Sequence, residues 1–302
     1  MGLKIFFGFL FFLLVVALLF IYWFFPLGGV VNFDFKPKNY NFSVNGEDMQ
    51  FYSKMRFKEP EISYKIIQCP IKKKNDIEYA FEIVSNKTRL SFYPVSYGES
   101  ISITCDSSAM VEGGLFIAGE GGPTNITKTE NFNVILNGKI LLIRESDCER
   151  PNIAIHELFH VLGFKHSSNL NNIMYNISKC EQVIGEDNIN LLEELYSIPS
   201  YPDLAFENIS SSMRSRYLDT NISIKNNGLQ KSGPAKIIIY ADEKNIKEIE
   251  LKPIDIGYGI TISLTNIFIN KLNVDKLEYM IDSKFDELDK ENNRAILEIK
   301  EE

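Results

Sequence analysis

The sequence predicts an apolar N-terminal helix, then an α/β domain and an all-β sandwich, within 302 residues. Three observations support this order. Residues 5–25 are apolar and uncharged, strand and helix patterns alternate from Glu61 onward, and short strand patterns recur from Asp203 to the end. A chain of this length can form two ordinary domains, each with its own buried core.

Composition and charge limit the function classes. Hydrophobic residues make up 45% and charged residues 24% of the chain, as in globular proteins. The net charge of -8 argues against a nucleic-acid partner, whose phosphates require a basic face. The basic run Lys72 to Lys74 adjoins Asn75 and Asp76 and is typical of a solvated surface.

The N-terminal segment, residues 1–29, predicts a transmembrane helix that acts as an uncleaved signal anchor. About 20 apolar residues span the hydrocarbon core of a bilayer, and the run here is longer than the apolar core of a cleavable signal peptide. Tyr22 and Trp23 suit the membrane interface, and Pro26 suits the end of a helix. Cleavage after the Gly28-Gly29 region is the alternative.

The four cysteines indicate that the body of the protein lies outside the cell. Lysines lie on both sides of the apolar run, so the charge bias barely decides the orientation. An even number of cysteines, with no Cys-x-x-Cys pair, suits two disulfides in an oxidising compartment. We therefore expect a single-pass protein of the cell membrane whose later domains are extracellular.

Residues 30–60 are expected to form a polar and aromatic lead-in to an α/β domain at residues 61–198. The alternation of strand and helix patterns in this domain favours a layered structure with parallel neighbouring strands. The first four elements are a strand at 62–67, a helix at 76–85, and strands at 90–93 and 101–104.

The glycine-rich stretch Gly113 to Pro123 predicts a short strand closed by a turn. It does not match a phosphate-binding loop, because no Gly-Lys-Ser/Thr follows and no helix begins there. Residues 133–143 predict a hairpin whose tight turn is Asn137-Gly138. Two helices follow, at residues 152–162 and 186–196.

Residues 203–302 predict an antiparallel β-sandwich. Pro199 and Pro202 mark the linker before it, and turn residues such as Asn226-Asn227-Gly228 separate the strand patterns. These patterns lie at residues 221–224, 235–240, 260–264 and 295–299.

All three histidines of the chain lie in one window, from His156 to His166. On a helix, His156 and His160 project from one side, a turn apart, and can bind one cation. Gly163 can adopt a positive φ, so the chain can turn back and bring His166 to the same ion. Three neutral imidazoles leave a fourth tetrahedral position open, as in catalytic zinc sites. Glu157 lies beside a ligand, where it can act as the general base.

Two other interpretations of the histidines have less support. A lone His-Glu-x-x-His pattern arises by chance and in other zinc hydrolases, so the glycine and the third histidine carry much of the argument. A closed structural site would need a fourth ligand, and no cysteine lies close enough in the sequence to supply one.

The window resembles the long zinc motif of the metzincins, His-Glu-x-x-His-x-x-Gly-x-x-His. Met174, followed by Tyr175, is similar to the Met-turn beneath the metal in that clan. Within the clan, the stretch from His166 to Tyr175 and the helix after Gly185 look most like the matrixins. Residues 114–123 are similar to the matrixin edge strand, and the whole resemblance covers residues 61–197.

The resemblance implies a metzincin-like α/β (α+β) fold with a mixed five-stranded sheet and three helices, and endopeptidase activity. Gly163, Met174 and Tyr175 would support the metal site. An extended substrate would pair with the edge strand through backbone hydrogen bonds. The candidate residues of this strand are Leu115, Phe116, Ile117, Ala118 and Gly119.

The sequence departs from the matrixins in three respects. No histidine is left for the second, structural zinc of animal matrixins, and the sequence has no recognisable cysteine-switch propeptide. Asn176 stands where a proline usually follows the Met-turn. We therefore expect one catalytic zinc ion, while calcium sites stay unassigned.

Within this fold, the positions of the four cysteines predict two disulfide bridges. Cys148 precedes the zinc helix and Cys180 follows the Met-turn, so a bridge between them would join the two flanks of the site. Cys69 and Cys105 end two predicted strands that could be neighbours, which predicts the second bridge.

The C-terminal segment resembles the CARDB domain, an adhesion-related β-sandwich of prokaryotic surface proteins. The similarity rests on Pro202-Asp203-Leu204, Asn226-Asn227-Gly228 and the stretch Asp286–Arg294. The acidic run Asp286–Glu291 favours a solvated turn over a calcium site. The sandwich could contact a surface or wall partner.

Together, these observations predict a metalloendopeptidase that hydrolyses extracellular protein substrates, with Glu157 as general base. Its partners would be peptide or protein substrates and, through the N-terminal helix, the membrane. The alternative is a surface binding or adhesion protein with a structural, non-catalytic zinc. Glu157 favours the enzyme, because a structural site has no use for a base there.

Overall fold

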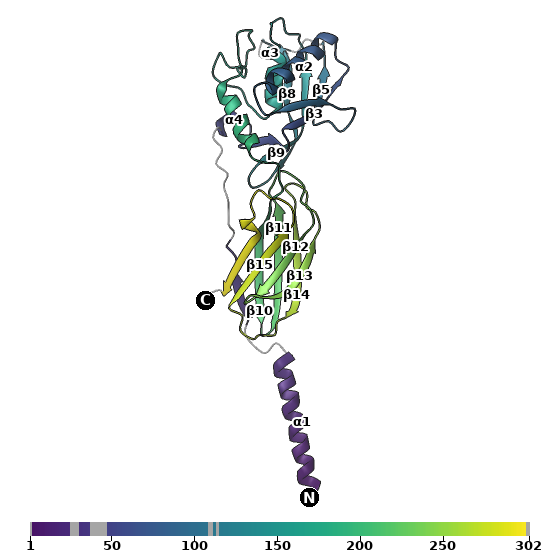
Figure 1. The fold of residues 1–302 in the computed structure, drawn as a ribbon, viewed down its shortest axis with the longest axis vertical. Coiled ribbons are helices and arrows are strands. Elements are labelled where there is room, and N and C mark those ends of the chain that lie inside the picture. Colours follow the sequence, from purple (N-terminus) through teal and green to yellow (C-terminus); the bar gives the residue numbers. More distant parts are fainter. Residues whose placement is uncertain (1, 25–29, 37–46, 108–110, 113–114, 300–302) are drawn as a thin grey trace.

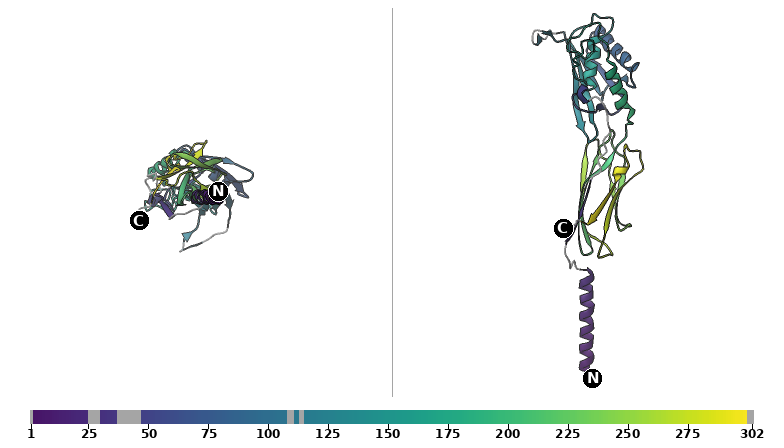
Figure 2. Two further views of the ribbon diagram at one scale, coloured as in Figure 1. Left: turned by 90° about the horizontal axis from the view of Figure 1, so that it is seen from below. Right: turned by 90° about the vertical axis from the view of Figure 1, so that its left-hand side faces the viewer.

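The computed structural model describes residues 2–24, 30–36, 47–107, 111–112 and 115–299. The parts of the chain follow one another along a rod (Figures 1 and 2). A single helix lies at one end, a β-structure occupies the middle, and an α/β structure forms the other end. We refer to residues 47–198 as the α/β module, and to residues 30–36 together with 203–299 as the sandwich module.

Helix α1 (Gly2–Phe24) is the helix predicted at the N-terminus. Its described side chains, such as those of Phe9, Phe11 and Leu14, are apolar and exposed, because the helix stands clear of the sandwich module (Figure 1). Within the part of the chain that the structure describes, no helix combines the length and the apolar character needed to cross a membrane. The membrane span stays a prediction.

The α/β module is built on one mixed sheet with the strand order β4-β3-β5-β9-β8. Four of these strands run parallel, and β8 pairs antiparallel with β9 at the edge. A short strand, β2, also pairs with β9, so the sheet has six strands where five were predicted. The strands are β2 (Met55–Phe57), β3 (Glu61–Ile67), β4 (Ser91–Pro94), β5 (Ile101–Cys105), β8 (Gly119–Lys128) and β9 (Asn133–Leu142).

Strands β8 and β9 correct two predictions. The glycines of residues 119–123 lie inside β8 and not in a closing turn, and Asn137-Gly138 lies in the middle of β9 and not at the tip of a hairpin. Gly138 allows close packing: a Cβ there would lie 2.5 Å from Val161 Cγ1 on the neighbouring helix. Glycines that indicate a turn in sequence also occur where a helix approaches a strand closely.

Three helices complete the module: α2 (Ile71–Ser85), α3 (Asn152–Val161) and α4 (Glu186–Ser197). Their apolar faces pack with the sheet into one core. Helix α2 begins earlier than predicted, directly after Pro70, and so includes the basic run. Lys73 in that run is buried and donates a hydrogen bond to the Ile143 carbonyl at 2.7 Å, so the predicted solvated surface holds only for its neighbours Lys72 and Lys74.

The sandwich module is antiparallel throughout. One half has the order β13-β12-β15-β16 and the other has β1-β10-β11-β14, and both halves contribute to one buried core. The strands after the linker are β10 (Leu204–Arg214), β11 (Tyr217–Asn226), β12 (Ala235–Ala241), β13 (Lys244–Leu251), β14 (Gly259–Phe268), β15 (Lys276–Ser283) and β16 (Arg294–Ile299).

The predicted lead-in contributes to both modules. Strand β1 (Val30–Asp34) pairs with β10 on one side and with β16 on the other, and Phe33 is buried in the sandwich core. Residues 47–57 belong instead to the α/β module, through β2 and the 3-10 turn η1 (Glu47–Met49). The α/β module is therefore inserted between the first and second strands of the sandwich.

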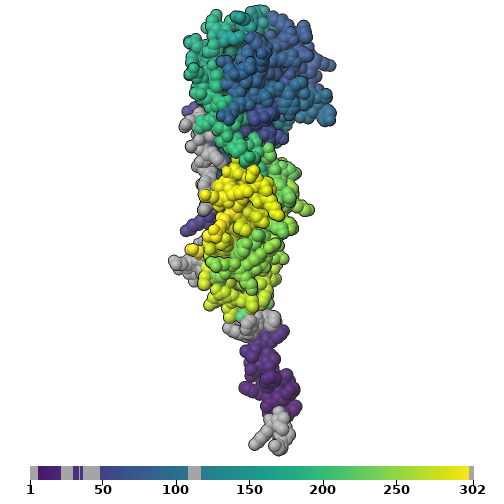
Figure 3. Space-filling view, in the orientation of Figure 1, coloured from purple at the N-terminus to yellow at the C-terminus, as the bar shows by residue number. Residues whose placement is uncertain are grey.

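The two modules meet through a small apolar core made by Phe132, Val134 and Leu229. Beside it, the Asn227 side-chain amide donates to Glu130 Oε2 at 3.1 Å, and the Glu130 N–H donates to Asn227 Oδ1 at 3.3 Å. Their surfaces are in contact in the space-filling view (Figure 3).

Candidate metal centre

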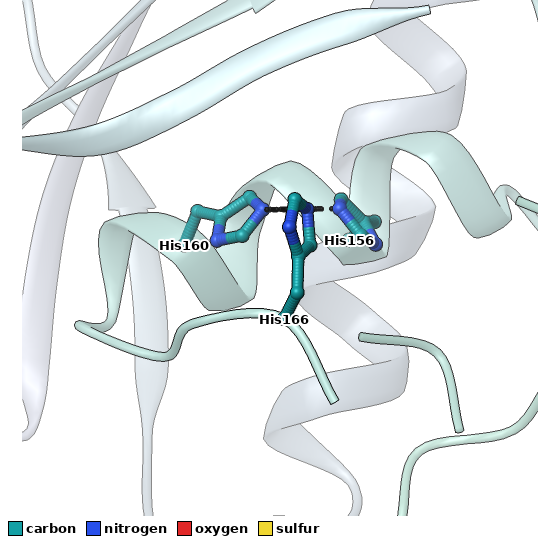
Figure 4. A group of neighbouring side chains, drawn as sticks. All are labelled: His156, His160 and His166. Atoms are coloured by element: carbon teal, nitrogen blue, oxygen red, sulfur yellow. Dashed lines mark hydrogen bonds between the residues drawn. The ribbon is translucent and has the colours of Figure 1, made fainter. Parts of the chain in front are cut away.

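The three histidines come together alongside helix α3 (Figure 4). His156 and His160 lie one turn apart on the helix, with their Nε2 atoms 3.0 Å from each other. His166 lies on the segment after the helix, and its Nε2 atom lies 3.1 Å from the Nε2 atom of His160. Their ligand atoms could hold a single metal ion.

The hydrogen bonds of the rings show that this arrangement fits a cation. His156 Nδ1 donates to the Ile173 carbonyl at 2.7 Å, and His160 Nδ1 donates to the Phe164 carbonyl at 2.8 Å. Carbonyl oxygens can only accept, so each neutral ring carries its proton on Nδ1 and presents a lone pair at Nε2. Two lone pairs that face each other at 3.0 Å repel unless a cation lies between them. This orientation by carbonyls is typical of zinc ligands.

A proton is a poor substitute for a metal cation at this position. Burial lowers the pKa of His160 to about 4, and the neighbouring His156 lowers it further. Burial also lowers the pKa values of His156 and His166. All three rings are therefore neutral near pH 7, which is the state that binds a divalent metal.

The turn after α3 brings His166 into place. Gly163 adopts a φ of 98°, in the region that side chains disfavour, and the chain reverses there as predicted. A Cβ on Gly163 would also lie 2.7 Å from the Met55 sulfur. Glycine is thus required both by the backbone angle and by the packing.

Residues 49–55, from the predicted lead-in, hold this turn. The Phe51 N–H donates to the Gly163 carbonyl at 2.9 Å, and the Lys165 N–H donates to the Met49 carbonyl at 3.0 Å. The Phe51 ring stacks on the His160 imidazole, with centroids 5.9 Å apart and planes at 27°. These residues could not be identified from the sequence, because a segment without hydrophobic periodicity gives no signal of such contacts.

Glu157 lies on α3 beneath the edge strand β8. Its side chain is only 6% exposed. A Cβ on Gly119 would lie 2.8 Å from Glu157 Cγ and 2.9 Å from the Leu141 carbonyl, and a Cβ on Gly121 would overlap the Glu157 backbone. The glycines of β8 therefore make room for the candidate base, a role that the glycine pattern alone did not reveal.

The surroundings of Glu157 favour its neutral form when no metal is bound. Burial raises its pKa to about 8, and the nearby carboxylate of Glu120 adds to this increase. A divalent cation beside Glu157 would act in the opposite direction and favour the carboxylate. Glu120, which is exposed on β8, is a second residue that the sequence analysis did not single out.

Met174 lies in a buried turn that supports the centre. Its side chain is fully buried, its N–H donates to Asn172 Oδ1 at 2.8 Å, and its carbonyl accepts from the Ser167 N–H at 2.8 Å. Tyr175 forms a parallel bridge with Ser167, next to His166. Both residues thus lie in a turn next to His166, and their role as a Met-turn stays a prediction.

A loop after this turn, residues 176–184, is fastened to the start of α3. The side chain of Asn152 donates to the Lys179 carbonyl at 2.7 Å, and Gln182 donates to the Ile177 carbonyl at 2.9 Å. The Cys148–Cys180 disulfide ties the same loop to the segment before α3. A second disulfide joins Cys69 and Cys105, at the ends of neighbouring strands β3 and β5. Both pairings are those predicted.

The predicted substrate strand is divided in the structure. Leu115 and Phe116 form β7 (Leu115–Phe116), which pairs with β6 (Val111–Glu112), while Gly119 is the first residue of β8. Ile117 and Ala118 lie between them, and the Ala118 carbonyl accepts from the N–H groups of Ile143 and Arg144. Among the described residues, β8 pairs with β9 on one edge only.

Comparisons with known proteins divide the chain at the linker. Residues 56–197 match the family model described as Matrixin, and residues 201–296 match the model described as CARDB. Among solved structures, a CARDB domain from Pyrococcus furiosus, in complex with di-metal ions, is 14% identical. The match covers 33% of this chain and 93% of that one, with a TM-score of 0.27. No curated protein matches the chain.

Proposed function

We propose that this chain, which resembles the matrixins over residues 56–197 and the CARDB domains over residues 201–296, is a zinc-dependent endopeptidase. Both resemblances were predicted from the sequence motifs and are confirmed by the family matches. The observation that carries the proposal is the convergence of the three imidazoles, each able to offer a neutral Nε2, beside the buried carboxyl of Glu157.

Each residue of the centre has a distinct task in this proposal. When bound, zinc supplies an electrophile that polarises the scissile carbonyl and makes water more acidic. His156, His160 and His166 hold it through Nε2. Glu157 accepts the proton of the attacking water and delivers it to the leaving nitrogen as the C–N bond breaks. The Ile173 and Phe164 carbonyls keep two of the rings in the required tautomer.

The substrate is an extended segment of a protein chain. Support comes from the edge of β8 that pairs with no other described strand, where backbone groups can pair with an added strand. Its glycines leave little side-chain bulk between that edge and Glu157. Residues 115–118 precede this edge in the sequence, and Gly119 begins it.

The proposed location is the outer face of the cell membrane, with α1 as a single anchor. Two disulfides favour an oxidising compartment. The apolar and exposed side chains of α1 favour a lipid environment over water. In the rod, the sandwich module lies between α1 and the metal centre (Figure 1), so the enzyme acts on targets at a distance from its anchor.

The test uses the full chain, purified in mild detergent because α1 exposes apolar side chains. We expect the wild type to bind one zinc and to cleave casein or a peptide library. Glu157→Gln should keep the zinc and lower kcat/KM by a factor of about 10² to 10⁴, the usual contribution of a general base. The exposed Glu149, which precedes α3, provides the matched control Glu149→Gln, which should retain full activity.

Two results would contradict the proposal. Wild-type protein that holds one zinc but cleaves no peptide in the library would favour the alternative, a surface binding protein with a structural metal. Glu157→Gln protein that cleaves as fast as the wild type would remove Glu157 from the mechanism. Zinc content measured by atomic absorption in each variant separates loss of the metal from loss of the base.

A further inference from the structure

A group of carboxylates and side-chain amides lies at the junction of the two modules. Asp203 directly precedes β10, and Asn131 lies on the connection from β8 to β9 in the α/β module. The loop between β15 and β16 supplies the remaining members, which are Glu287, Asp289, Asn292 and Asn293. The group is therefore assembled from three segments that are distant in sequence.

The carboxylates are held by amide donors. Asp203 accepts from Asn292 Nδ2 at 2.9 Å and from Asn131 Nδ2 at 3.3 Å. Glu287 accepts from Asn293 Nδ2 at 2.8 Å and from the Leu204 N–H at 2.7 Å. Each asparagine thus directs its nitrogen at a carboxylate of the group.

This arrangement leaves four buried oxygens without a hydrogen-bond donor. They are Asn131 Oδ1, Asn292 Oδ1, Asn293 Oδ1 and Asp289 Oδ2. Asn131 is only 6% exposed and Asn293 only 5%. A buried polar atom without a partner is unfavourable and uncommon. Three of these oxygens belong to the asparagines that contact Asp203 and Glu287, so their concentration at this junction indicates a bound cation that would coordinate such oxygens.

The negative charges of the group also lack a positive partner within the part of the chain that the structure describes. Asp203, Glu287 and Asp289 take part in none of the ion pairs formed among the described residues. Asp203 and Glu287 are buried, and buried carboxylates are normally paired with a cation or coordinated to a metal. The predicted solvated turn therefore describes Asp286, which is exposed, but not Glu287.

We propose that a calcium ion binds at this junction, between Asp203, Asp289 and the amide oxygens of Asn131 and Asn292. A 180° rotation of each side-chain amide group exchanges the positions of its nitrogen and its oxygen with little change of shape. The rotated amides of Asn131 and Asn292 would direct their oxygens toward the ion. Carboxylate and amide oxygens are the ligands that Ca²⁺ prefers, while nitrogen and sulfur ligands that would select zinc are absent from the six residues.

A cation at this position would connect the modules, because Asn131 belongs to the α/β module and the other ligands to the sandwich module. It would fix the orientation of the metal centre relative to the rod. The proposal does not depend on peptidase activity, since the ligands of the junction and those of the zinc centre are different residues.

The experiment titrates CaCl2 into the full zinc-loaded chain by calorimetry, with thermal unfolding measured in parallel. We expect one calcium per chain and, at a hundredfold excess over Kd, a Tm increase of roughly 5 °C. Asp289→Asn should weaken binding at least about tenfold, since it removes one ligand charge. Asn131→Leu should weaken binding as well, because it removes the ligand that the α/β module supplies. Asp286→Asn is the matched control from the same loop and should bind as the wild type does.

Three outcomes would overturn the proposal. A wild-type chain that neither exchanges heat nor gains stability in roughly 10 mM calcium, about ten times the weakest Kd of extracellular calcium modules, would show that water satisfies the buried oxygens. Equal affinity in Asp289→Asn and wild type would place the calcium elsewhere. Loss of binding in Asp286→Asn alone would indicate a surface site. Because no readout is peptide cleavage, failure here leaves the proposed endopeptidase unaffected.

Discussion

At the scale of single residues, the position of Glu157 depends on two glycines in strand β8, where any side chain would collide with it. Gly119 and Gly121 bring the β8 backbone close to α3. Glycine is usually considered for its backbone freedom, but here neither residue has a positive φ. Their contribution is space for the carboxyl group and for the helix backbone.

Gly119→Ala therefore tests the space around the candidate base. Its Cβ would lie 2.8 Å from Glu157 Cγ, so the carboxyl group must move. We expect kcat to fall by at least about tenfold, since small displacements of a catalytic group are costly. Gly122→Ala is the matched control, because a Cβ there meets nothing within 4 Å. Equal kcat values for the two variants would show that Gly119 has no such role.

Asp203 gives a prediction for the pH dependence of stability in calcium-free buffer. Burial raises its pKa from 3.8 to about 6, and Asp289 and Glu287 add to this, although the Asn292 hydrogen bond opposes it. The folded chain then binds this proton more tightly than the unfolded chain. The free energy of unfolding should fall as pH rises from about 4 to about 6, by on the order of 3 kcal/mol.

Urea denaturation between pH 4 and pH 8 measures this contribution. Asp203→Asn removes the titrating group, so its curve should lose that part of the slope while other carboxylates still titrate. Parallel curves for the variant and the wild type would contradict the assignment to Asp203.

At the scale of elements, two segments hold the metal ligands from opposite sides. Residues 49–55 contact the turn after α3 and the His160 ring. The loop 176–184 supports Ile173 from the other side, since the Val183 carbonyl accepts the Ile173 N–H at 2.7 Å, and Ile173 in turn orients His156. Neither segment supplies a ligand, but both fix ligand geometry.

The two disulfides allow a matched test of the loop 176–184. Cys148–Cys180 and Cys69–Cys105 close loops of similar sequence separation, 32 and 36 residues. Replacing either pair by serine should lower stability by about 3–4 kcal/mol. Only the Cys148→Ser/Cys180→Ser variant should also lose zinc affinity, by about 10- to 100-fold, as when ligand-orienting contacts are removed. Chelator competition measures it, and equal zinc affinity in both variants would contradict this role.

Phe51→Ala tests the segment on the other side of the centre. Removing the ring exposes one face of the His160 imidazole, so we expect faster zinc release to a chelator with the fold retained. Phe51 is 46% exposed, so the variant should remain folded. Tyr52→Ala, next along the chain and more exposed, is the control and should release zinc at the wild-type rate.

At the scale of the whole molecule, strand β1 determines how the modules are connected. It pairs with β10 over Val30–Phe33 and with β16 at Phe33 and Asp34. The α/β module is consequently attached to the sandwich at both of its ends. Such an attachment restricts rotation between the modules more than a single linker would.

Truncation tests this arrangement. A chain that begins at residue 30 keeps β1, whereas one that begins at residue 40 loses the strand and the buried Phe33. Loss of a buried phenylalanine side chain costs about 3–5 kcal/mol. The shorter chain should therefore unfold its sandwich module at a clearly lower Tm in calorimetry. Equal Tm values for the two chains would show that β1 is dispensable.

The sequence predicted those parts of the molecule whose signals are local. The histidine ligands, Glu157 and Gly163 occupy one helix and its turn, so their spacing determines their geometry. The contributions of Phe51, Met55 and Gly119 depend on tertiary packing with α3 and could not be read from neighbouring residues. Strand β1 could not be predicted either, because both of its partners lie beyond the whole α/β module in the sequence. The sandwich and the α/β layering followed from repeated patterns.

Strand β1 also has a consequence for biosynthesis. The nascent chain delivers β1 first, β10 only after the whole α/β module, and β16 last. The earliest strand therefore has no partner until the α/β module has been synthesised, and it gains its second partner only when translation is almost finished. Closing contacts so distant in sequence is slow. A prematurely terminated product lacks β16 and leaves the sandwich open beside β1, so quality-control proteases could distinguish it from the finished protein.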